Sequence, residues 1–148
     1  MTRIRRIVCA SDFSSASRKA FATAVMLAKV NRAALTMVHV VTPIVRLAPD
    51  QYVASTTWEE IEIGTRAWAQ AQIDRLAAKA KRAGIRATAL LLEGDAPEEI
   101  VRAAQLKRSD LLVLGTHGRT GLSKLFLGSV AERVVATAPC PVVTVRGK

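Results

Sequence analysis

Short apolar runs alternate along this chain with longer amphipathic stretches. Five runs are almost continuously apolar, at residues 5–10, 34–41, 85–92, 110–115 and 141–146. Continuous apolar runs are typical of strands that are covered on both faces, as in a parallel sheet. Four stretches with helical spacing of apolar positions lie between them, at residues 15–31, 58–83, 97–107 and 130–137. The pattern predicts nine elements in strict alternation, beginning and ending with a strand.

The predicted helix ends carry recognisable signals. A small polar residue precedes an acid by three positions at Thr57–Glu60, Asp95–Glu98 and Ser129–Glu132, which predicts a capping box at each helix start. Gly84 is well placed to end the second helix. Within that helix, we expect Trp58 and Trp68 to face the core.

Strict alternation of strands and helices favours one architecture. Parallel neighbours need crossover connections, which are nearly always right-handed. We therefore predict an α/β fold over residues 1–148: a single domain with an open, doubly wound five-stranded parallel sheet, four helices and three layers. The connection at 42–56 is long, which is typical either of a lid or binding loop or of a simple cover over apolar surface.

The charge balance is strongly basic, with a formal net charge of +10 in 148 residues and a pI near 10.6. Such a balance favours anionic partners: nucleic acid, phosphates or an acidic surface. The basic residues are scattered along the sequence, however, and no aromatic residues are interleaved with them for base stacking. We therefore interpret them as a solvated surface and do not expect nucleic acid to be the main partner.

No segment has the roughly 20 apolar residues that a membrane span needs, and the first residues lack the apolar run of a signal peptide. Cys9 and Cys140 lie in or beside apolar runs without metal-ligand spacing, which indicates packed thiols in a reducing compartment. We therefore expect a cytoplasmic protein that makes no membrane contact.

Four glycines are concentrated in one strand-to-helix connection, at Gly115, Gly118, Gly121 and Gly128. Ser129 stands beside the last of them, at a predicted helix start, where free amides and the helix dipole favour an anion. Arg119 and Lys124 in the same loop would add charge-assisted contacts to a phosphate. The alternative is that the glycines only shape turns and Ser129 only caps the helix.

A second polar loop, at residues 10–15, follows the first strand. If the first and fourth strands are neighbours, both loops line one crevice at the carboxyl ends of the strands. Asp12 would contact a ligand there, or instead accept hydrogen bonds from backbone amides at the first helix start. We interpret His39 as a satisfied strand histidine, and we assign no catalytic role to His117 or to any other residue.

The spacing Gly115-x2-Gly118-x9-Gly128-Ser129 resembles the signature of the ATP-binding branch of the universal stress protein family. Nearly the whole chain takes part in the resemblance, including the segments at 8–17, 37–40, 93–97 and 138–143. The family implies the strand order 3-2-1-4-5 and a homodimer joined along the last strand, here residues 141–146. That strand would otherwise be an exposed apolar edge.

The resemblance also implies residue roles. Asp12 would lie near the ribose or the metal-bearing phosphates, the backbone of Val40 against adenine, and Leu114 and Gly115 along the ribose. The phosphates would be held by Gly118, Gly128, Ser129, Val130 and Ala131, while the role of Arg119 stays open.

We therefore expect an ATP-binding protein of the stress response, with Mg²⁺ accompanying the nucleotide and an unidentified protein partner. Asp12 is the one candidate acid for catalysis, so we expect binding with at most slow hydrolysis rather than an enzyme. Two alternatives stay open: a slow ATP-hydrolysing enzyme, and an anion-binding interaction module without nucleotide preference.

Overall fold

The computed structural model describes residues 3–43, 55–117 and 127–147. Within these ranges strands and helices alternate as predicted: β1 (Arg6–Ala10), α1 (Ser15–Asn31), β2 (Ala34–Val41), α2 (Ser55–Arg82), β3 (Ala87–Glu93), α3 (Ala96–Leu106), β4 (Leu111–Gly115), α4 (Ser129–Thr137) and β5 (Val142–Val145). Most bounds lie within two residues of the predicted ones.

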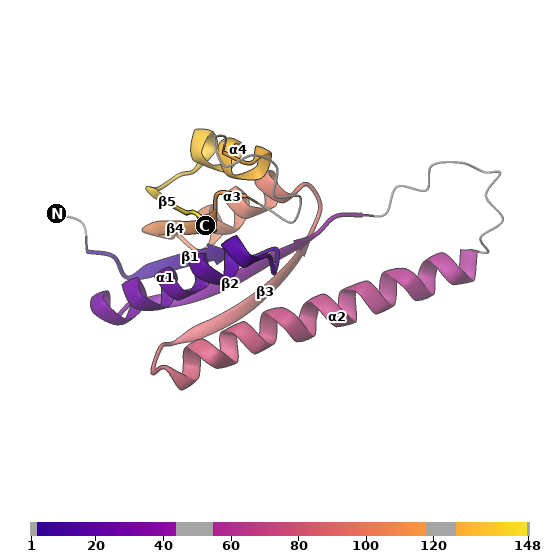
Figure 1. The fold of residues 1–148 in the computed structure, drawn as a ribbon, viewed down its shortest axis with the longest axis horizontal. Coiled ribbons are helices and arrows are strands. Elements are labelled where there is room, and N and C mark those ends of the chain that lie inside the picture. The colour runs from indigo at the N-terminus through magenta and orange to yellow at the C-terminus, as the bar shows by residue number, and fades with distance from the viewer. Residues whose placement is uncertain (1–2, 44–54, 118–126, 148) are drawn as a thin grey trace.

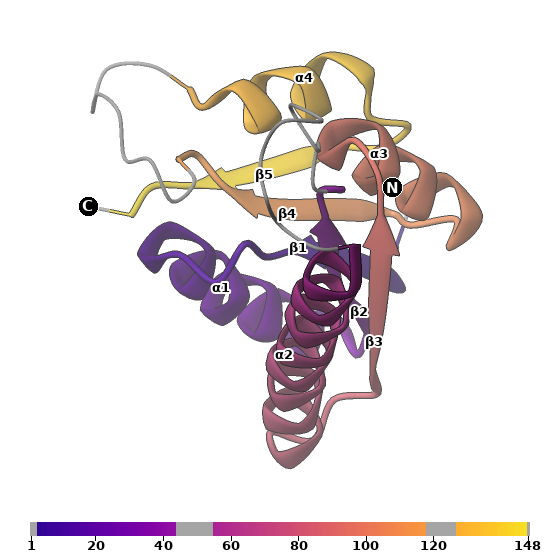
Figure 2. The ribbon, with the colours of Figure 1, turned by 90° about the vertical axis from the view of Figure 1, so that its right-hand side faces the viewer.

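The strands form one parallel sheet in the order β3-β2-β1-β4-β5. Helices α1 and α2 cover one face, and α3 and α4 cover the other (Figures 1 and 2). The predicted α/β fold, the implied strand order and the three layers are thus confirmed. No helix in the described ranges is long and apolar enough to cross a membrane.

Alternate side chains of each central strand enter two separate cores. Ile7 and Cys9 of β1 pack towards α1 and α2, whereas Val8 and Ala10 pack towards α3 and α4. Both faces of the sheet are buried, which is why the strand segments are continuously apolar rather than alternating. Cys9 is fully buried, and burial raises the pKa of its thiol to about 12. Cys140 is partly buried, and neither cysteine forms a disulfide.

Helix α2 departs from the prediction. It begins at Ser55 instead of residue 58, so Thr57 lies inside the first turn and is not a cap. The core face consists of Ala69, Ile73, Ala77 and Ala80, and Trp68 is 47% exposed. The first turns of α2 project beyond the sheet (Figure 1), so periodicity alone could not identify the buried face. Residues 44–54 of the long predicted connection lie outside the described residues.

The other two predicted capping boxes also lack their side-chain bond. Asp95 is the N-cap of α3, but its carboxylate makes no cap bond and instead contacts Arg133 of α4 at 3.2 Å. At α4 the N-cap is Gly128, and Ser129 is the first helical residue. The prediction that Ser129 caps α4 is therefore wrong. Gly84 follows α2 at φ +85°, as its predicted role requires.

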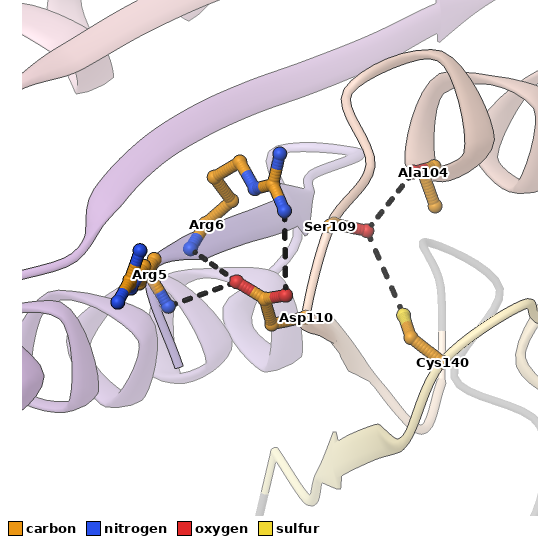
Figure 3. Close-up of polar contacts among 6 residues, drawn as sticks. All are labelled: Arg5, Arg6, Ala104, Ser109, Asp110 and Cys140. Atoms are coloured by element: carbon orange, nitrogen blue, oxygen red, sulfur yellow. Dashed lines mark hydrogen bonds and ion pairs between the residues drawn. The ribbon is translucent and has the colours of Figure 1, made fainter. Parts of the chain in front are cut away.

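At the amino ends of β1 and β4, one carboxylate joins the strands. Asp110 Oδ2 accepts hydrogen bonds from the backbone N–H groups of Arg5 and Arg6, each at 2.9 Å, and Oδ1 lies 3.6 Å from the Arg6 guanidinium (Figure 3). The bond from the Arg5 N–H is the largest influence that lowers the pKa of Asp110, and the contacts with Arg6 lower it further. Beside it, Ser109 Oγ donates to the carbonyl of Ala104 at 3.2 Å and lies 3.6 Å from Cys140 Sγ. These contacts close the amino end of the sheet.

Candidate functional site

A cavity of about 480 Å³ lies at the carboxyl ends of β1, β2 and β4. From β1 the chain adds β2 and β3 on one side of the sheet, and it then returns to the other side of β1 to add β4 and β5. Ligands of open α/β sheets bind at such a switch point, in pockets of roughly 300–1,000 Å³. The helix starts of α3 and α4 complete the wall.

Eight of the ten predicted site residues line this cavity. They are Asp12, Val40, Leu114, Gly115, Gly128, Ser129, Val130 and Ala131. The other two, Gly118 and Arg119, lie outside the described residues, as do Gly121 and Lys124 of the same loop. The fold thus brings together segments that are more than a hundred residues apart in sequence.

The backbone of Val40 faces the cavity because β1 ends before it. Val38 is the last residue of β2 paired with β1, and its carbonyl accepts the N–H of Ser11 at 2.9 Å. In a parallel strand, alternate residues direct both backbone groups to the same neighbour. Val40 therefore directs its N–H and C=O towards the β1 side, where no partner strand reaches it. A donor and an acceptor at this spacing can recognise the edge of a flat heterocycle.

Helix α4 presents its amino end to the cavity. Gly128 is the N-cap with extended backbone, and Ser129, Val130 and Ala131 form the first turn. The amides of a first turn have no acceptor within the helix, and the dipole places positive potential at this end. The N-cap residue, Gly128, has no side chain that could cap them. This arrangement is suited to an anionic group.

The two described glycines of the motif have a packing role. A Cβ on Gly128 would lie 2.8 Å from the backbone oxygen of Thr116, and one on Gly115 would lie 3.0 Å from both the carbonyl carbon and the Cβ of Ala16. Gly128 also donates its N–H to the carbonyl of Thr116. The fold itself therefore needs glycine at both positions. The two glycines are therefore not by themselves evidence for a ligand. The evidence for an anion site is the free amides at the start of α4.

Asp12 holds the start of α1 while lining the cavity. Its Oδ1 accepts hydrogen bonds from the Ser14 N–H at 3.0 Å and from Ser17 Oγ at 2.9 Å. The alternative role proposed from the sequence, a contact with helix-start amides, is thus present. The next residue, Phe13, has φ 64°, a conformation that non-glycine residues rarely adopt. Such strain is found preferentially at functional sites.

An aromatic contact supports this loop. The Phe13 ring lies 4.4 Å from the His39 ring and 5.4 Å from that of Trp68, centroid to centroid. His39 Nδ1 lies 2.7 Å from the carbonyl oxygen of Ser11. His39 is therefore hydrogen-bonded at a strand end, as interpreted from the sequence, but it also lines the cavity.

Sequence reasoning placed both polar loops at the crevice but assigned no ligand contact to several polar residues of the wall. Ser11, Ser17, Thr116 and His117 all line the cavity, and the first three are buried. Thr116 Oγ1 lies 2.9 Å from His117 Nδ1, while the buried His117 Nε2 has no hydrogen-bond partner among the described residues. For Ser11, Thr116 and His117 the available signal was their position directly after β1 or β4, where side chains meet at the switch point, whereas Ser17 lies in the first turn of α1.

The described wall of the cavity provides one carboxylate for a metal ion and not a complete set of protein ligands. The described residues contain no cluster of three or more His, Cys, Asp or Glu side chains that could hold a metal. Asp12 is the carboxylate of the described cavity wall. Magnesium is commonly held by one or two carboxylates together with phosphate oxygens of a substrate. Asp12 is therefore the residue that would contact such an ion.

Comparison with known proteins identifies the family. The family model described as the universal stress protein family matches residues 3–146, so the chain belongs to that family. A universal stress protein of Methanocaldococcus jannaschii is 36% identical over 144 residues, which cover 96% of this chain and 82% of that protein. A universal stress protein of Thermus aquaticus is 38% identical over 142 residues, covering 96% and 98% of the two chains.

Solved structures share the fold. The universal stress protein UspA from Lactobacillus plantarum is similar with a TM-score of 0.83 and 26% identity, covering 99% of this chain and 100% of that one. A universal stress protein solved in complex with cAMP gives a TM-score of 0.74 at 22% identity, covering 99% and 100% of the two chains. One from Archaeoglobus fulgidus, solved in complex with dAMP, gives 0.64 at 20% identity, covering 97% and 99%.

Proposed function

We propose that this universal stress protein binds ATP in the cavity and acts as a nucleotide-dependent module of the stress response. The observation that carries the proposal is the pairing of two features across one cavity: the unpaired backbone edge of Val40 and the amino end of α4. The first suits a nucleobase and the second suits phosphates. The complexes of structural neighbours with cAMP and dAMP support an adenine nucleotide as the ligand.

The proposed pose follows the chemistry of the wall. Adenine would lie against the backbone of Val40, near the apolar side chains of Val38 and Ile100. The ribose would lie along Leu114 and Gly115, and the phosphates at the amides of residues 129–131. The resemblance adds Gly118, and leaves open Arg119, on the phosphate side. Magnesium, when bound, would neutralise phosphate charge next to Asp12.

We propose binding with at most slow hydrolysis. Fast phosphoryl transfer needs a group that positions the attacking water as well as metal ligands. Asp12 already accepts two hydrogen bonds that hold the start of α1. Its carboxylate is therefore suited to a fixed structural contact with the metal or ribose rather than to proton transfer. A multiple-turnover assay with ATP tests this point.

We also propose a homodimer through residues 141–146 and a cytoplasmic location. β5 pairs only with β4 in the described sheet, so its outer edge is available to a second copy. The nucleotide state would alter contacts with a protein partner. Sedimentation analysis at several protein concentrations, with and without ATP, tests the dimer.

The decisive experiment is the melting temperature of the purified protein with ATP, GTP, AMP and pyrophosphate, each with and without Mg²⁺. A ligand at about 100 times its Kd stabilises the native state by about 2.7 kcal/mol, which shifts the melting temperature by several degrees. We expect the largest shift with ATP and Mg²⁺. Equal shifts with pyrophosphate would favour an anion-binding module instead, and no shift after removal of co-purified nucleotide would contradict the proposal.

A further inference from the structure

Basic side chains gather at the end of the molecule opposite the cavity. This end, the basic pole, consists of the amino ends of the strands and the connections before them, at residues 3–6, 29–34, 79–87, 106–111 and 137–142. It holds 11 of the chain's 22 Lys and Arg residues but one of its 12 Asp and Glu residues. Its formal net charge of +10 equals that of the whole chain, so the rest of the chain is electrically balanced.

Backbone hydrogen bonds join the segments of the basic pole side by side. The carbonyl of Arg86 accepts the N–H of Leu35 at 2.9 Å, and the carbonyl of Arg5 accepts that of Ala34 at 2.8 Å. The carbonyl of Arg6 accepts the N–H of Asp110 at 2.8 Å. Cations that are scattered in sequence therefore share one surface, which is the left-hand side of Figure 1, where the N-terminus and the turn between α2 and β3 lie.

Few of the cationic side chains of the basic pole form ion pairs within the protein. In the described ranges, the pole has one ion pair, between Arg6 and Asp110, and Asp110 also accepts two backbone N–H groups. All eleven cationic residues are exposed. Helix dipoles account for the cations in the last turns of α1 and α2. They do not account for Arg86, which precedes β3. Arg32 is the C-cap of α1 and Arg108 follows the C-cap of α3, so the dipoles favour a cation there as well.

Two of these arginines occupy a backbone conformation that disfavours them. Arg32 has φ 54° and Arg108 has φ 48°. After a helix, this left-handed conformation is usually adopted by glycine or asparagine, because a Cβ makes it costly. Stability alone would therefore favour glycine at both positions. Arginine at these two costly positions indicates that the charge itself has a use.

The basic pole also exposes two aliphatic side chains. Val30 is 80% exposed and Leu106 is 72% exposed, the two highest values among the large hydrophobic residues of the described ranges. Each is adjacent in sequence to a lysine, Lys29 or Lys107. Nucleic acid would offer these side chains little apolar surface, and the pole has no aromatic residue for base stacking. An anionic bilayer offers both phosphate charge and an apolar boundary.

We propose that the basic pole docks this protein on the surface of an anionic lipid bilayer, with its cations at the headgroups and Val30 and Leu106 at the acyl boundary. The contact is peripheral, and it leaves the cavity, at the opposite end, open to solvent. The sequence-based expectation of no membrane contact considered only apolar spans. It did not consider a charge that is assembled by the fold.

The test is co-sedimentation of the full chain with vesicles of phosphatidylcholine alone, or with about 30% phosphatidylglycerol, at about 50 mM and about 500 mM KCl. We expect binding to the anionic vesicles only, and weaker binding at the higher salt concentration. Each Lys or Arg near an anionic surface contributes about 1 kcal/mol, or about fivefold in partition coefficient. Equal binding to both vesicle types would overturn the proposal.

Two double variants that lose the same charge show whether vesicle binding depends on the basic pole or only on the net charge of the protein. Arg32→Gly with Arg108→Gly should lower the partition coefficient about 25-fold, and should not lower the melting temperature, because glycine suits both backbones. The matched control, Lys19→Gln with Arg75→Gln, removes two exposed cations outside the pole and should bind nearly as well as the parent. Equal losses in the two variants would show that net charge, not this surface, drives binding.

A third variant tests the choice of lipid over nucleic acid. Val30→Ser with Leu106→Ser should weaken vesicle binding several-fold without changing its salt dependence, because the cations are kept. Unchanged vesicle binding would contradict the lipid assignment. So would binding to a DNA duplex of about 30 base pairs, at equal phosphate concentration, in the absence of vesicle binding.

Discussion

The two ends of the sheet use different parts of the chain to meet an anion. At the carboxyl ends of the strands, α3 and α4 begin beside a cavity, and the positive potential comes from backbone amides. At the amino ends, where the four helices finish, the helix dipoles are negative and the positive potential comes from side chains. Backbone dipoles are fixed by the fold, whereas side-chain charge can be changed one residue at a time. We infer that the carboxyl end is suited to one defined ligand and the amino end to a diffuse partner.

The largest expected effect is at the carboxyl end, where the fold has no room for an added side chain. Gly115→Val should destabilise the protein by about 3 kcal/mol, because the new Cβ meets the backbone of Ala16 and Ser17. The control is Gly64→Ala in α2, where no atom lies within 4 Å of the added Cβ and helix propensity favours alanine. Urea denaturation measures both. Equal stability of the two variants would contradict the close packing of α1 on β4.

At the amino end, Asp110→Ala should cost about 2 kcal/mol, because the backbone N–H groups of Arg5 and Arg6 lose a charged acceptor. Folding lowers the pKa of Asp110 from 3.8, so the contribution of its carboxylate to the free energy of unfolding is fully present at neutral pH. This contribution is lost as the pH falls below 3.8 and passes through the lowered pKa of the folded state. The difference in unfolding free energy between parent and variant should therefore narrow on acidification. A difference that stays constant down to strongly acidic pH would exclude this role.

The next effect concerns ligand affinity rather than stability. Ser129→Pro removes one amide from the first turn of α4, where proline is well tolerated, and the extended backbone of Gly128 suits a following proline. We expect about tenfold weaker ATP binding, the loss of one charge-assisted hydrogen bond. Ser129→Ala, which keeps the amide, is the matched control. Calorimetric titration that gives equal affinities for both variants would contradict the phosphate site at α4.

The smallest effect is expected at the contact between α3 and α4. Arg133 lies 3.2 Å from Asp95 and 3.7 Å from Glu98, with about half of its side chain exposed. Arg133→Gln should therefore cost less than about 1 kcal/mol, and the loss should shrink at high salt. Arg102→Gln, which removes the pair with Glu99 within α3, is the control. A loss that is insensitive to salt would indicate a packing role instead.

The element order could be predicted because burial on both faces leaves continuous apolar runs, as in β1 and β4. The order of the strands came from the family resemblance, since short apolar runs do not specify their neighbours. The buried face of α2 was mispredicted, because the first turns of that helix project beyond the sheet and Trp68 is 47% exposed. Helix propensity and the spacing of apolar residues contain no information about how far a helix extends beyond the sheet on which it packs.

At the site, the residues that line the cavity were largely predictable, but their individual roles were not. Gly115 and Gly128 suggested bare backbone for a ligand, yet their close neighbours are Ala16 and Thr116. Those contacts join segments remote in sequence, so no local pattern reveals them. The basic pole was missed for the same reason: its cations come from four segments that meet only in the folded chain.

The aromatic contact beside the cavity has a practical consequence. Trp68 is half exposed and its indole lies edge-on to Phe13, the residue that follows Asp12 in the strained loop. A ligand that repositions this loop changes the surroundings of the indole and hence its fluorescence emission. With Trp58 replaced by Phe, the single remaining indole would report occupancy of the cavity in real time, without a label.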